Sequence, residues 1–555
     1  MKKIIITITM AWMSITLSAQ NKDTKKADKL YNRLEYIDAI EGYLKLVENK
    51  KEDAYVQKQL AEAYRRTSNT AEAEKWYAKV VQSGNAEDYF WYAEILKANG
   101  KNNESKTWMQ KFATANPQDS RAVAFKKDPE YLEKIVSQKE KFKAEKTDLN
   151  TEFSDFGGYV NNGKVYFASA RNTSNRTYGW NKQPTLDLYA ADFDNGNLSN
   201  IKPLEGDINS KYNEGSVAIT SDGKKMYFTR TNYLAGNYEK DSEGISNLKI
   251  FSAEKVGEKW TNIKDLPFNN DAYSTGHPAL SLDGKTLYFA STMPNGYGKT
   301  DLYKVAITGE NTFGTPENLG TKINTPGDEQ FPFIGTDGTL YFSSNGHLGL
   351  GGLDIFYAKQ TNGNFGEVQN IGKPVNSSQD DFAFYFDDAT QKGFVSSSRK
   401  GGSGSDDIYS ISKIIPAVEK IIEVVKEEPI VKTPVKETAV ATLKFEPIHF
   451  DFDSSAITPE SALALDKIVE TMKKNQGLEI LVTSHSDNVG GLNYNEKLSE
   501  KRASKTVQYI VSKGISKTRI SGKGAGSSNP KVVCSECTEE QNMQNRRSEF
   551  LIVKQ

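Results

Sequence analysis

The sequence predicts a multidomain protein in which an α-helical solenoid and a β-propeller precede a small α/β module. Three observations predict this architecture. A helical pattern with an internal repeat fills the N-terminal quarter, a strand-and-turn unit recurs five times in the middle, and the C-terminal fifth alternates strands with two helices. A chain of 555 residues is also too long for one hydrophobic core, so about two to four domains are expected.

The balance of charge argues against a nucleic-acid-binding protein. The chain has 71 Lys and Arg against 72 Asp and Glu, which gives a net charge of -1. A nucleic-acid binder needs a basic surplus or a basic stripe. The 27 Tyr and 26 Phe residues instead favour a β-rich core. We therefore expect no nucleic-acid partner.

The N-terminal stretch MKKIIITITMAWMSITLSAQ has the features of a secretory signal peptide. Lys2 and Lys3 form a basic start, the run from Ile4 to Leu17 is apolar, and small residues follow at a position suited to cleavage. We therefore expect residues 1–20 to direct export and the fold to begin near Asn21.

The remaining sequence predicts a protein without a membrane anchor. No later apolar stretch reaches the roughly 18 residues of a membrane-spanning helix. The only cysteines are Cys534 and Cys537, so there is no N-terminal cysteine to carry a lipid. We expect a periplasmic location, with no transmembrane segment and no lipid attachment.

Residues 21–142 are predicted to be helical, with an internal repeat. Ala39 and Tyr43 recur as Ala73 and Tyr77, which gives a period of 34 residues. A helix-turn-helix unit of this length, with small residues at close-packing positions, resembles the tetratricopeptide repeat family. The resemblance implies stacked helices with a concave groove that binds a protein partner. A helical bundle whose spacing arises by chance is the alternative.

Residues 143–413 contain five units of about 50 to 60 residues, each with about four strands, which is typical of a β-propeller. Each unit has a turn followed by a strand, as in SDGKKMYFTR, LDGKTLYFAS and TDGTLYFSS. These units resemble the WD-like "PD" propeller repeats of periplasmic proteins. Five blades are expected, with six as the alternative. A further element opens each unit, at Leu149, Ile208, Phe268, Ile323 and Val375.

A propeller requires closure of its last blade. The outer strand of each later blade precedes the opening element of the next unit, and residues 143–150 hold the same position before the first unit. We therefore predict that residues 143–150 pair with the fifth blade and close the ring. An outermost strand drawn from residues after Ile414 is the alternative. The preceding segment, 120–142, is predicted to be one charged helix.

Residues 414–443 are rich in Val, Ile, Lys, Glu and Pro, which predicts an extended charged linker. Residues 444–555 predict a compact α/β module. Thr458 is expected to cap a helix that starts at Pro459 and runs to about Lys474. A second helix is expected over 494–512, and strands are expected at KFEPIHFDFD, LEILVTSHSD, RISGKGAG and RRSEFLIV.

The module contains a candidate binding site. Asp487 follows an apolar strand, and Asn495 and Arg502 lie seven residues apart, so they share one face of a helix. An Asp and an Arg around one concavity suit a zwitterion, because the carboxylate accepts from an ammonium group and the guanidinium binds a carboxylate. An internal Asp487–Arg502 salt bridge that only orients the helix is an equal alternative.

Four motifs in this module, FDFD, SHSD, NEKLSEKRA and NRRSEF, occur in order and resemble the OmpA-like C-terminal domain, a peptidoglycan-binding module. The resemblance implies that Asp487 and Arg502 hold the diaminopimelate of the wall peptide. Asn495 matches the first residue of the helix motif, and Arg546 matches an arginine near the ligand. This sequence departs from the family at Ser486, where Thr is usual, and at Ser484, where Gly is usual.

Cys534 and Cys537 form a CxxC pair in a chain predicted to be exported, which favours a disulfide. A redox motif is less favoured because no thioredoxin-like context surrounds the pair. Zinc is also less favoured, because two thiols lack two further nearby ligands. We expect no metal site.

An enzyme is the main rival class of function. The sequence has no G-x-S-x-G motif, and its four histidines form no cluster. We therefore expect a protein that is not an enzyme and needs no cofactor. The Asp-Gly aspartates are expected to form turns. The histidines are placed as follows: His277 and His347 in propeller loops, His449 beside a strand, and His485 in the wall-binding motif.

The order of the parts predicts a scaffold. Helical repeats, a propeller and an OmpA-like domain in this order resemble exported proteins of the Bacteroidetes, some tied to type IX secretion or gliding. The resemblance implies a protein that binds peptidoglycan and presents its helices and propeller to outer-membrane or secretion-system proteins. Family members often have a carboxypeptidase-regulatory-like domain where this chain has only residues 414–443. A propeller-based hydrolase or glycan sensor, anchored to the wall, is the alternative.

Overall fold

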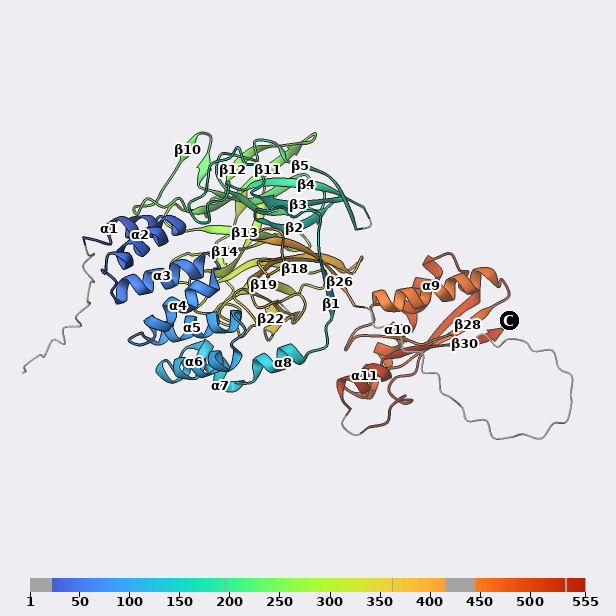
Figure 1. The fold of residues 1–555 in the computed structure, drawn as a ribbon. Coiled ribbons are helices and arrows are strands. Elements are labelled where there is room, and N and C mark those ends of the chain that lie inside the picture. The colour runs from blue at the N-terminus through green and yellow to red at the C-terminus, as the bar shows by residue number, and fades with distance from the viewer. Residues whose placement is uncertain (1–21, 195, 362, 415–444, 535–536, 555) are drawn as a thin grey trace, which may run out of the picture. The chain divides into compact units, whose positions relative to one another are not determined.

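The computed structural model describes two compact units, which divide near residue 419 (Figure 1). The predicted signal peptide, 1–20, lies outside the described residues, as does the predicted linker, 414–443, except for Ile414. The helices that the structure describes include none with the length and apolar character needed to cross a membrane. The described residues are 22–194, 196–361, 363–414, 445–534 and 537–554.

The first unit begins with helices that pack in chain order, each of α1 to α6 against the next. Ala39, Tyr43, Ala73 and Tyr77, the repeated positions, are all fully buried between these helices. The predicted single helix over 120–142 is wrong, because the chain breaks at Asp128-Pro129, where proline disfavours helical backbone in the residue before it. The helices are α1 (Lys25–Asn32), α2 (Tyr36–Glu48), α3 (Ala54–Arg66), α4 (Thr70–Val80), α5 (Ala86–Ala98), α6 (Asn102–Ala115), α7 (Ser120–Lys127) and α8 (Tyr131–Ser137).

Five sheets follow, and their main strands pair antiparallel with their neighbours in the chain. The first contains β2 (Asp155–Asn161), β3 (Lys164–Ser169), β4 (Asp187–Asp194) and β5 (Asn197–Pro203). The second contains β7 (Glu214–Ile219), β8 (Lys225–Thr231), β11 (Leu248–Val256) and β12 (Lys259–Asp265), with the short strand β6 (Glu205–Gly206) at its edge, parallel to β12. The third contains β13 (Thr275–Leu280), β14 (Thr286–Ser291), β15 (Asp301–Gly309), β16 (Thr312–Phe313) and β17 (Glu317–Asn318), which pairs with β15.

The fourth sheet contains β18 (Glu329–Ile334), β19 (Leu340–Ser344), β20 (Asp354–Ala358) and β23 (Gln369–Asn370). The fifth contains β24 (Asp381–Asp387), β25 (Lys392–Ser397), β26 (Asp407–Lys413) and β1 (Phe142–Lys146). Two small hairpins lie between sheet strands: β9 (Tyr233–Leu234) with β10 (Asn237–Tyr238), and β21 (Gln360–Thr361) with β22 (Asn364–Phe365).

The first strands of the five sheets meet in a closed order. Strand β7 contacts β2 and β13, β18 contacts β13 and β24, and β24 contacts β2. The fifth sheet takes its outermost strand from the start of the region, since β1 pairs with β26 from Phe142 opposite Lys413 to Lys146 opposite Tyr409. The predicted closure by residues 143–150 is confirmed, although the pairing begins one residue earlier and ends at Lys146.

In each of the five units, the side chain of one asparagine forms two hydrogen bonds with the backbone of a sheet strand. At the fourth sheet, the Asn376 side chain accepts from the Ile355 amide at 2.7 Å and donates to the Ile355 carbonyl at 2.9 Å. One side chain thus replaces a strand partner, which matters because a buried backbone group without a partner is costly. The same exchange joins Asn150 to Ile408, Asn209 to Leu188, Asn269 to Ile250 and Asn324 to Leu302.

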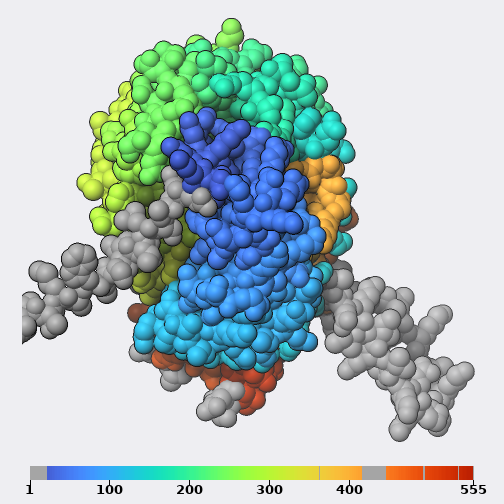
Figure 2. Space-filling view, turned by 60° about the vertical axis from the view of Figure 1, so that its left-hand side comes forward, coloured from blue at the N-terminus to red at the C-terminus, as the bar shows by residue number. Residues whose placement is uncertain are grey.

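The helices pack against the sheets within the first unit, as Figure 2 shows for the blue helices over the green sheets. The Trp180 indole donates to the Arg66 carbonyl, and the Gln379 amide donates to the Ala98 carbonyl, both at 3.0 Å. Leu350, from a sheet loop, joins the helical hydrophobic core. Part of the helical surface therefore contacts the chain itself rather than a separate partner.

Buried carboxylates open four of the first strands. Asp155 pairs with Arg171 at 2.7 Å, and Asp381 pairs with Arg399 at 2.6 Å. Glu214 pairs with Arg230 in the same way. The fourth carboxylate, at Glu329, instead accepts from the hydroxyls of Thr325 and Ser344, and burial raises its pKa to about 8.

The second unit is a four-stranded sheet with helices packed against it. The strand order is β27-β30-β28-β29, with β28 parallel to β29 and antiparallel to β30. The predicted helix at 459–474 is confirmed, with the Thr458 hydroxyl accepting from the Ser461 amide. The elements are β27 (Ile448–His449), α9 (Pro459–Lys474), β28 (Glu479–Ser484), α10 (Leu492–Ser512), a 3-10 turn (Lys517–Arg519), β29 (Ile520–Gly524), α11 (Glu539–Asn545) and β30 (Arg547–Lys554).

Two features of this unit differ from the prediction. The expected strand KFEPIHFDFD pairs only at Ile448–His449, and the rest of that stretch is irregular. Helix α11 was not predicted. Its signal was the capping box, in which the Thr538 hydroxyl bonds the Gln541 amide and the Gln541 side chain bonds back.

We predict that Asn376→Ala destabilises the first unit. The change removes both bonds to Ile355, so the free energy of unfolding should fall by about 2 kcal/mol. Urea unfolding followed by intrinsic fluorescence measures it. Asn103→Ala, at an exposed helical position, is the matched control and should change stability by less than about 0.5 kcal/mol. Equal effects of the two changes would contradict the fastening role.

We predict that Glu329→Gln removes part of the pH dependence of stability. The folded state holds the Glu329 proton up to about pH 8, whereas the unfolded chain releases it near the ordinary value of 4.5. The native state therefore binds more protons between these values, and stability falls as the pH rises through them. In the variant, the free energy of unfolding should therefore fall less steeply as the pH rises over this range.

The comparison uses thermal unfolding at several pH values across this range. Glu258→Gln, whose side chain is 78% exposed, is the control and should leave the wild-type pH dependence unchanged. An unchanged slope in Glu329→Gln would mean that Glu329 is ionised in the folded state.

Candidate functional site

Asp487 lies three residues after the end of β28, and its side chain is almost fully buried. One carboxylate oxygen accepts from Nη1 of Arg546 at 2.9 Å, and the other accepts from the Val489 amide at 3.3 Å. The carboxylate is therefore held by a cation from the other end of the module. This pairing replaces the Asp487–Arg502 salt bridge that was the alternative from the sequence.

Arg546 sits between α11 and β30 and is 2% exposed. Besides Asp487, its guanidinium donates to the Phe450 carbonyl at 3.0 Å and to the Glu539 carboxylate at 2.6 Å. Burial alone would lower the pKa of Arg546, but its bonds to these two carboxylates outweigh burial and raise the pKa. Arg546 is thus a fixed positive charge behind Asp487.

Arg502 projects from α10 into a cage of backbone carbonyls and is fully buried. Nε donates to the Ser454 carbonyl at 2.7 Å, Nη1 to that of His485 at 3.1 Å and Nη2 to that of Asp451 at 3.0 Å. Burial lowers the pKa of Arg502 to about 10, and the charge of Asp487 opposes that shift. Arg502 therefore stays charged at neutral pH, and its partners carry only partial charges.

Polar atoms without partners lie beside these charges. The hydroxyl of Ser486 and the amide oxygen of Asn495 are buried and accept or donate no hydrogen bond in the structure. Asn495 only donates weakly, to the Gly490 carbonyl at 3.5 Å. A buried polar atom without a partner costs free energy, so these two atoms have unused hydrogen-bonding capacity.

The structure brings Asp487, Arg502 and Arg546 together, whereas Asn495 forms its one hydrogen bond with the Gly490 carbonyl. Asp487 and Arg546 form an ion pair, Arg502 lies within electrostatic reach of Asp487, and Asn495 lies on the same helix as Arg502. Two cations, Arg502 and Arg546, meet two carboxylates, Asp487 and Glu539, and Glu539 is 73% exposed at the edge of the cluster. The arrangement suits a ligand that carries a carboxylate and an ammonium group.

The groups that hold the two arginines were not predicted from the sequence. The carbonyls of Asp451 and Ser454 fix Arg502, and Glu539 fixes Arg546. The FDFD motif marks the segment that contains Asp451, but the sequence predicts a strand there. Backbone carbonyls cannot be predicted as ligands of an arginine from residue types. Phe450 of the same motif lies under Arg502, with the guanidinium carbon 5.1 Å from the ring centre.

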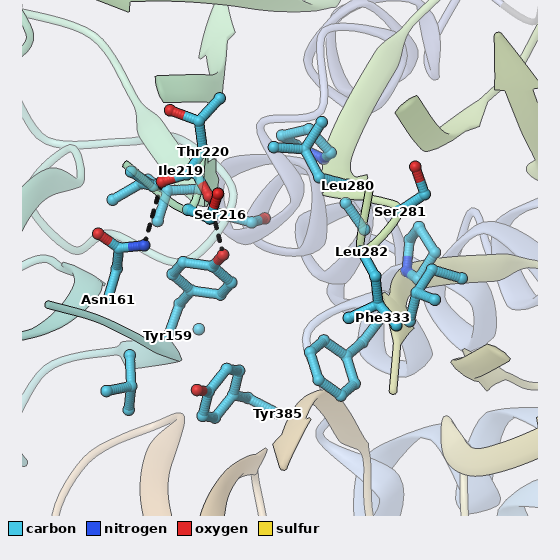
Figure 3. Close-up of a pocket in the computed structure, with 18 of the residues that line it drawn as sticks. Tyr159, Asn161, Ser216, Ile219, Thr220, Leu280, Ser281, Leu282, Phe333 and Tyr385 are labelled. Atoms are coloured by element: carbon cyan, nitrogen blue, oxygen red, sulfur yellow. Dashed lines mark hydrogen bonds between the residues drawn. The ribbon is translucent and has the colours of Figure 1, made fainter. Parts of the chain in front are cut away.

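A cavity of about 720 Å³ lies within the ring of sheets. It is the place to look for catalytic groups if the protein is an enzyme. Figure 3 shows Tyr159 and Tyr385 on one side and Leu280, Leu282 and Phe333 on the other, and the ring centres of Phe333 and Tyr385 are 5.3 Å apart. This wall is largely apolar and aromatic.

Ser216 and His277 form a pair in the same cavity, with Oγ 2.7 Å from Nδ1. The expected loop position of His277 is wrong, because the residue lies within β13 at a positive φ of 54°. Burial lowers the pKa of His277 to about 3. An imidazole with this pKa holds a proton poorly, so it is a weak base for activating Ser216.

Other predicted features have local roles. Asp222 and Asp283 accept from hydroxyls and amides of their own turns, as turn formers do. Cys534 and Cys537 form a disulfide in the structure. Among the described residues, no group of three or more His, Cys, Asp and Glu is placed to hold a metal ion.

We predict that Arg546→Ala destabilises the second unit. It leaves the Asp487 carboxylate buried without its cation, so the free energy of unfolding should fall by about 3 kcal/mol. Lys513→Ala is the control, since it breaks an exposed ion pair with Asp466 in the same unit and should cost about 0 to 1 kcal/mol. Thermal unfolding measures both, and equal losses would show that the buried pair is not special.

Comparison with known proteins places a family in this unit. The OmpA family description matches residues 449–546, so the C-terminal module is an OmpA-family domain. Outer membrane protein A of Bordetella avium is 39% identical over 104 residues, which are 19% of this chain and 53% of that protein. Outer membrane protein A of Klebsiella aerogenes is 38% identical over 96 residues, which are 17% and 27%. The chain thus spans about half, or less, of the length of these curated relatives.

Two solved structures align with the same fifth of the chain. The peptidoglycan-associated lipoprotein from Burkholderia pseudomallei is 26% identical and aligns over 20% of this chain and 89% of its own, with a TM-score of 0.18. The cell wall anchor of the T6SS from Pseudomonas aeruginosa is 26% identical and aligns over 20% of this chain and 80% of its own, with a TM-score of 0.18.

Proposed function

We propose that this protein is a non-enzymatic periplasmic scaffold that binds peptidoglycan through its OmpA-family domain. The observation that carries the proposal is the pair of buried, unpartnered polar atoms on Ser486 and Asn495 beside Asp487 and Arg502. Charged groups that are already fixed, next to polar atoms that lack partners, fit a ligand that supplies the missing bonds.

The chemistry of a diaminopimelate side chain matches this cluster. Its ammonium group would donate to Asp487, which already has Arg546 behind it. Its carboxylate would take the N–H groups of Arg502 that remain after three are bonded to carbonyls, since a guanidinium has five. Fixed partners lower the cost of ordering the site when the ligand binds.

For the first unit we propose two domains. The packed helices and the buried Ala39 and Ala73 support tetratricopeptide repeats over 21–142. The five sheets and the closed contacts of their first strands support a five-bladed propeller over 143–413. We propose that these domains present surfaces to outer-membrane partners, in type IX secretion or gliding, after export directed by residues 1–20.

A wall-anchored glycan sensor is the second candidate function. The observation that favours it is the aromatic wall of Tyr159, Phe333 and Tyr385 in the 720 Å³ cavity, because aromatic rings stack on the apolar faces of sugars. Retention of soluble glycans by variants that no longer bind the wall would favour this candidate.

The scaffold proposal predicts that Asp487→Ala and Arg502→Ala each weaken binding to purified sacculi. Each change leaves one end of the zwitterion without its partner, at a cost of about 2 to 3 kcal/mol, or about 30- to 150-fold in affinity. A pull-down measures it, with near-UV circular dichroism as the check on folding. Asp466→Ala, in the same domain and 42% exposed, is the control. Full retention by both variants would refute the site.

Ser486→Ala separates binding from folding within the same experiment. Its hydroxyl has no partner in the structure, so its removal should leave stability unchanged or slightly raised. If the hydroxyl serves the ligand, affinity for sacculi should fall about tenfold. Unchanged affinity would show that the Ser486 hydroxyl does not contact the ligand, which would contradict the proposal.

A further inference from the structure

The first two sheets carry long loops that the other sheets lack. The second and third strands of the first two sheets are joined by residues 170–186 and 232–247. The matching loops of the other three sheets are little more than half as long, at 292–300, 345–353 and 398–406. The two long loops border a cleft of about 530 Å³ that the turn between α1 and α2 and the end of α3 also line, which we term the rim cleft.

Three tyrosines cluster beside this cleft, and two of them, Tyr212 and Tyr238, line it. The rings of Tyr212 and Tyr238 stack in parallel, with centres 4.2 Å apart and planes at 7°. Tyr233 packs against Tyr212 with its centre at 5.0 Å. Tyr233 and Tyr238 belong to the hairpin β9–β10, so the long loop of the second sheet contributes two of the three tyrosines, and Tyr212 precedes β7.

Three cations surround the tyrosine cluster. The Lys211 ammonium lies 5.6 Å from the centre of Tyr212, the Lys240 ammonium 5.3 Å from that of Tyr238, and the Arg176 guanidinium 5.7 Å from that of Tyr212. Aromatic faces attract cations and restrict their side chains. The cluster therefore gathers three positive charges in one place.

These cations are not neutralised. In the part of the chain that the structure describes, Arg176, Lys211 and Lys240 form no ion pair with a carboxylate. Only two carboxylates line the cleft, and both have other partners. Glu35 pairs with an arginine of its own turn at 2.8 Å, and Asp328 accepts from Thr300 and Asn345 side chains. The lining has five basic and two acidic residues: Arg33, Arg66, Arg176, Lys211 and Lys240 against Glu35 and Asp328.

The wall of the rim cleft is fixed before any ligand binds. The Trp180 indole donates to the Arg66 carbonyl at 3.0 Å, and Lys182 pairs with Asp38 of α2 at 2.5 Å. Both contacts tie the long loop of the first sheet to the helices. The buried Nε of Arg66 faces the Glu62 carboxylate at 3.9 Å, so this lining arginine already has an acidic neighbour.

We propose that the rim cleft binds a small polyanion that carries at least two phosphate or carboxylate groups. Three unneutralised cations on a fixed aromatic support match separated negative charges, and charge-assisted bonds of this kind are the strong ones. Phosphate and carboxylate share this chemistry. The proposal goes beyond wall binding and is independent of it, since the cleft lies in the first unit.

Isothermal titration calorimetry of the full chain tests the proposal with two probes, pyrophosphate and citrate. We expect at least one probe to bind, with an affinity that falls as salt rises, and the stronger probe identifies the anionic group. The double variant Lys211→Ala/Lys240→Ala should bind it at least about tenfold more weakly. Arg176→Ala should weaken the same probe as a single, independent change.

The matched control is Lys224→Ala/Lys285→Ala, which removes the same charge at exposed turns outside the rim cleft. It should retain the wild-type affinity. Binding of neither probe at millimolar concentration, or equal weakening in both double variants, would overturn the proposal. Tight binding of polyglutamate by a chain that binds neither small probe would assign the cleft to an acidic polypeptide and would also overturn it.

Discussion

The buried ion pair between Asp487 and Arg546 is the interaction on which the candidate site depends. Both side chains are at most 5% exposed, and a buried charge without a partner is strongly destabilising. Arg546 comes from the last turn before β30, and Asp487 follows β28, so the pair joins two segments far apart in the chain. Because Arg546 is the direct partner of Asp487, Arg502 forms its hydrogen bonds with backbone carbonyls instead.

The first unit also contains buried polar groups with hydrogen-bond partners. At one position that recurs in all five units, different residue types supply the partner. In each of the five units, the backbone carbonyl of the first residue of the opening element accepts a hydrogen bond from a side chain. The donors and acceptors are Arg171 to Leu149, Arg230 to Ile208, Tyr273 to Phe268, His347 to Ile323 and Arg399 to Val375. The sequence of this position varies, whereas its hydrogen bond does not, which explains how unlike units build like sheets.

The sequence predicted the repeats well because their signals are local. Glycine turns, alternating strands and the capping residue Thr458 are each visible within a few residues, and the closing strand followed from counting strands per unit. The four candidate site residues were predicted from motifs. Their partners were not, because Arg546 meets Asp487 only through the fold and the carbonyls around Arg502 have no sequence signal. The helix break at Pro129 was visible in the sequence but was overlooked.

The most direct test of the account is a crystal structure of the full chain with a tripeptide that ends in diaminopimelate. The account predicts the ligand ammonium on the Asp487 carboxylate and its carboxylate on Arg502, with Ser486 and Asn495 newly bonded. A ligand bound elsewhere, with Asp487 and Arg546 unchanged and Ser486 still without a partner, would contradict it.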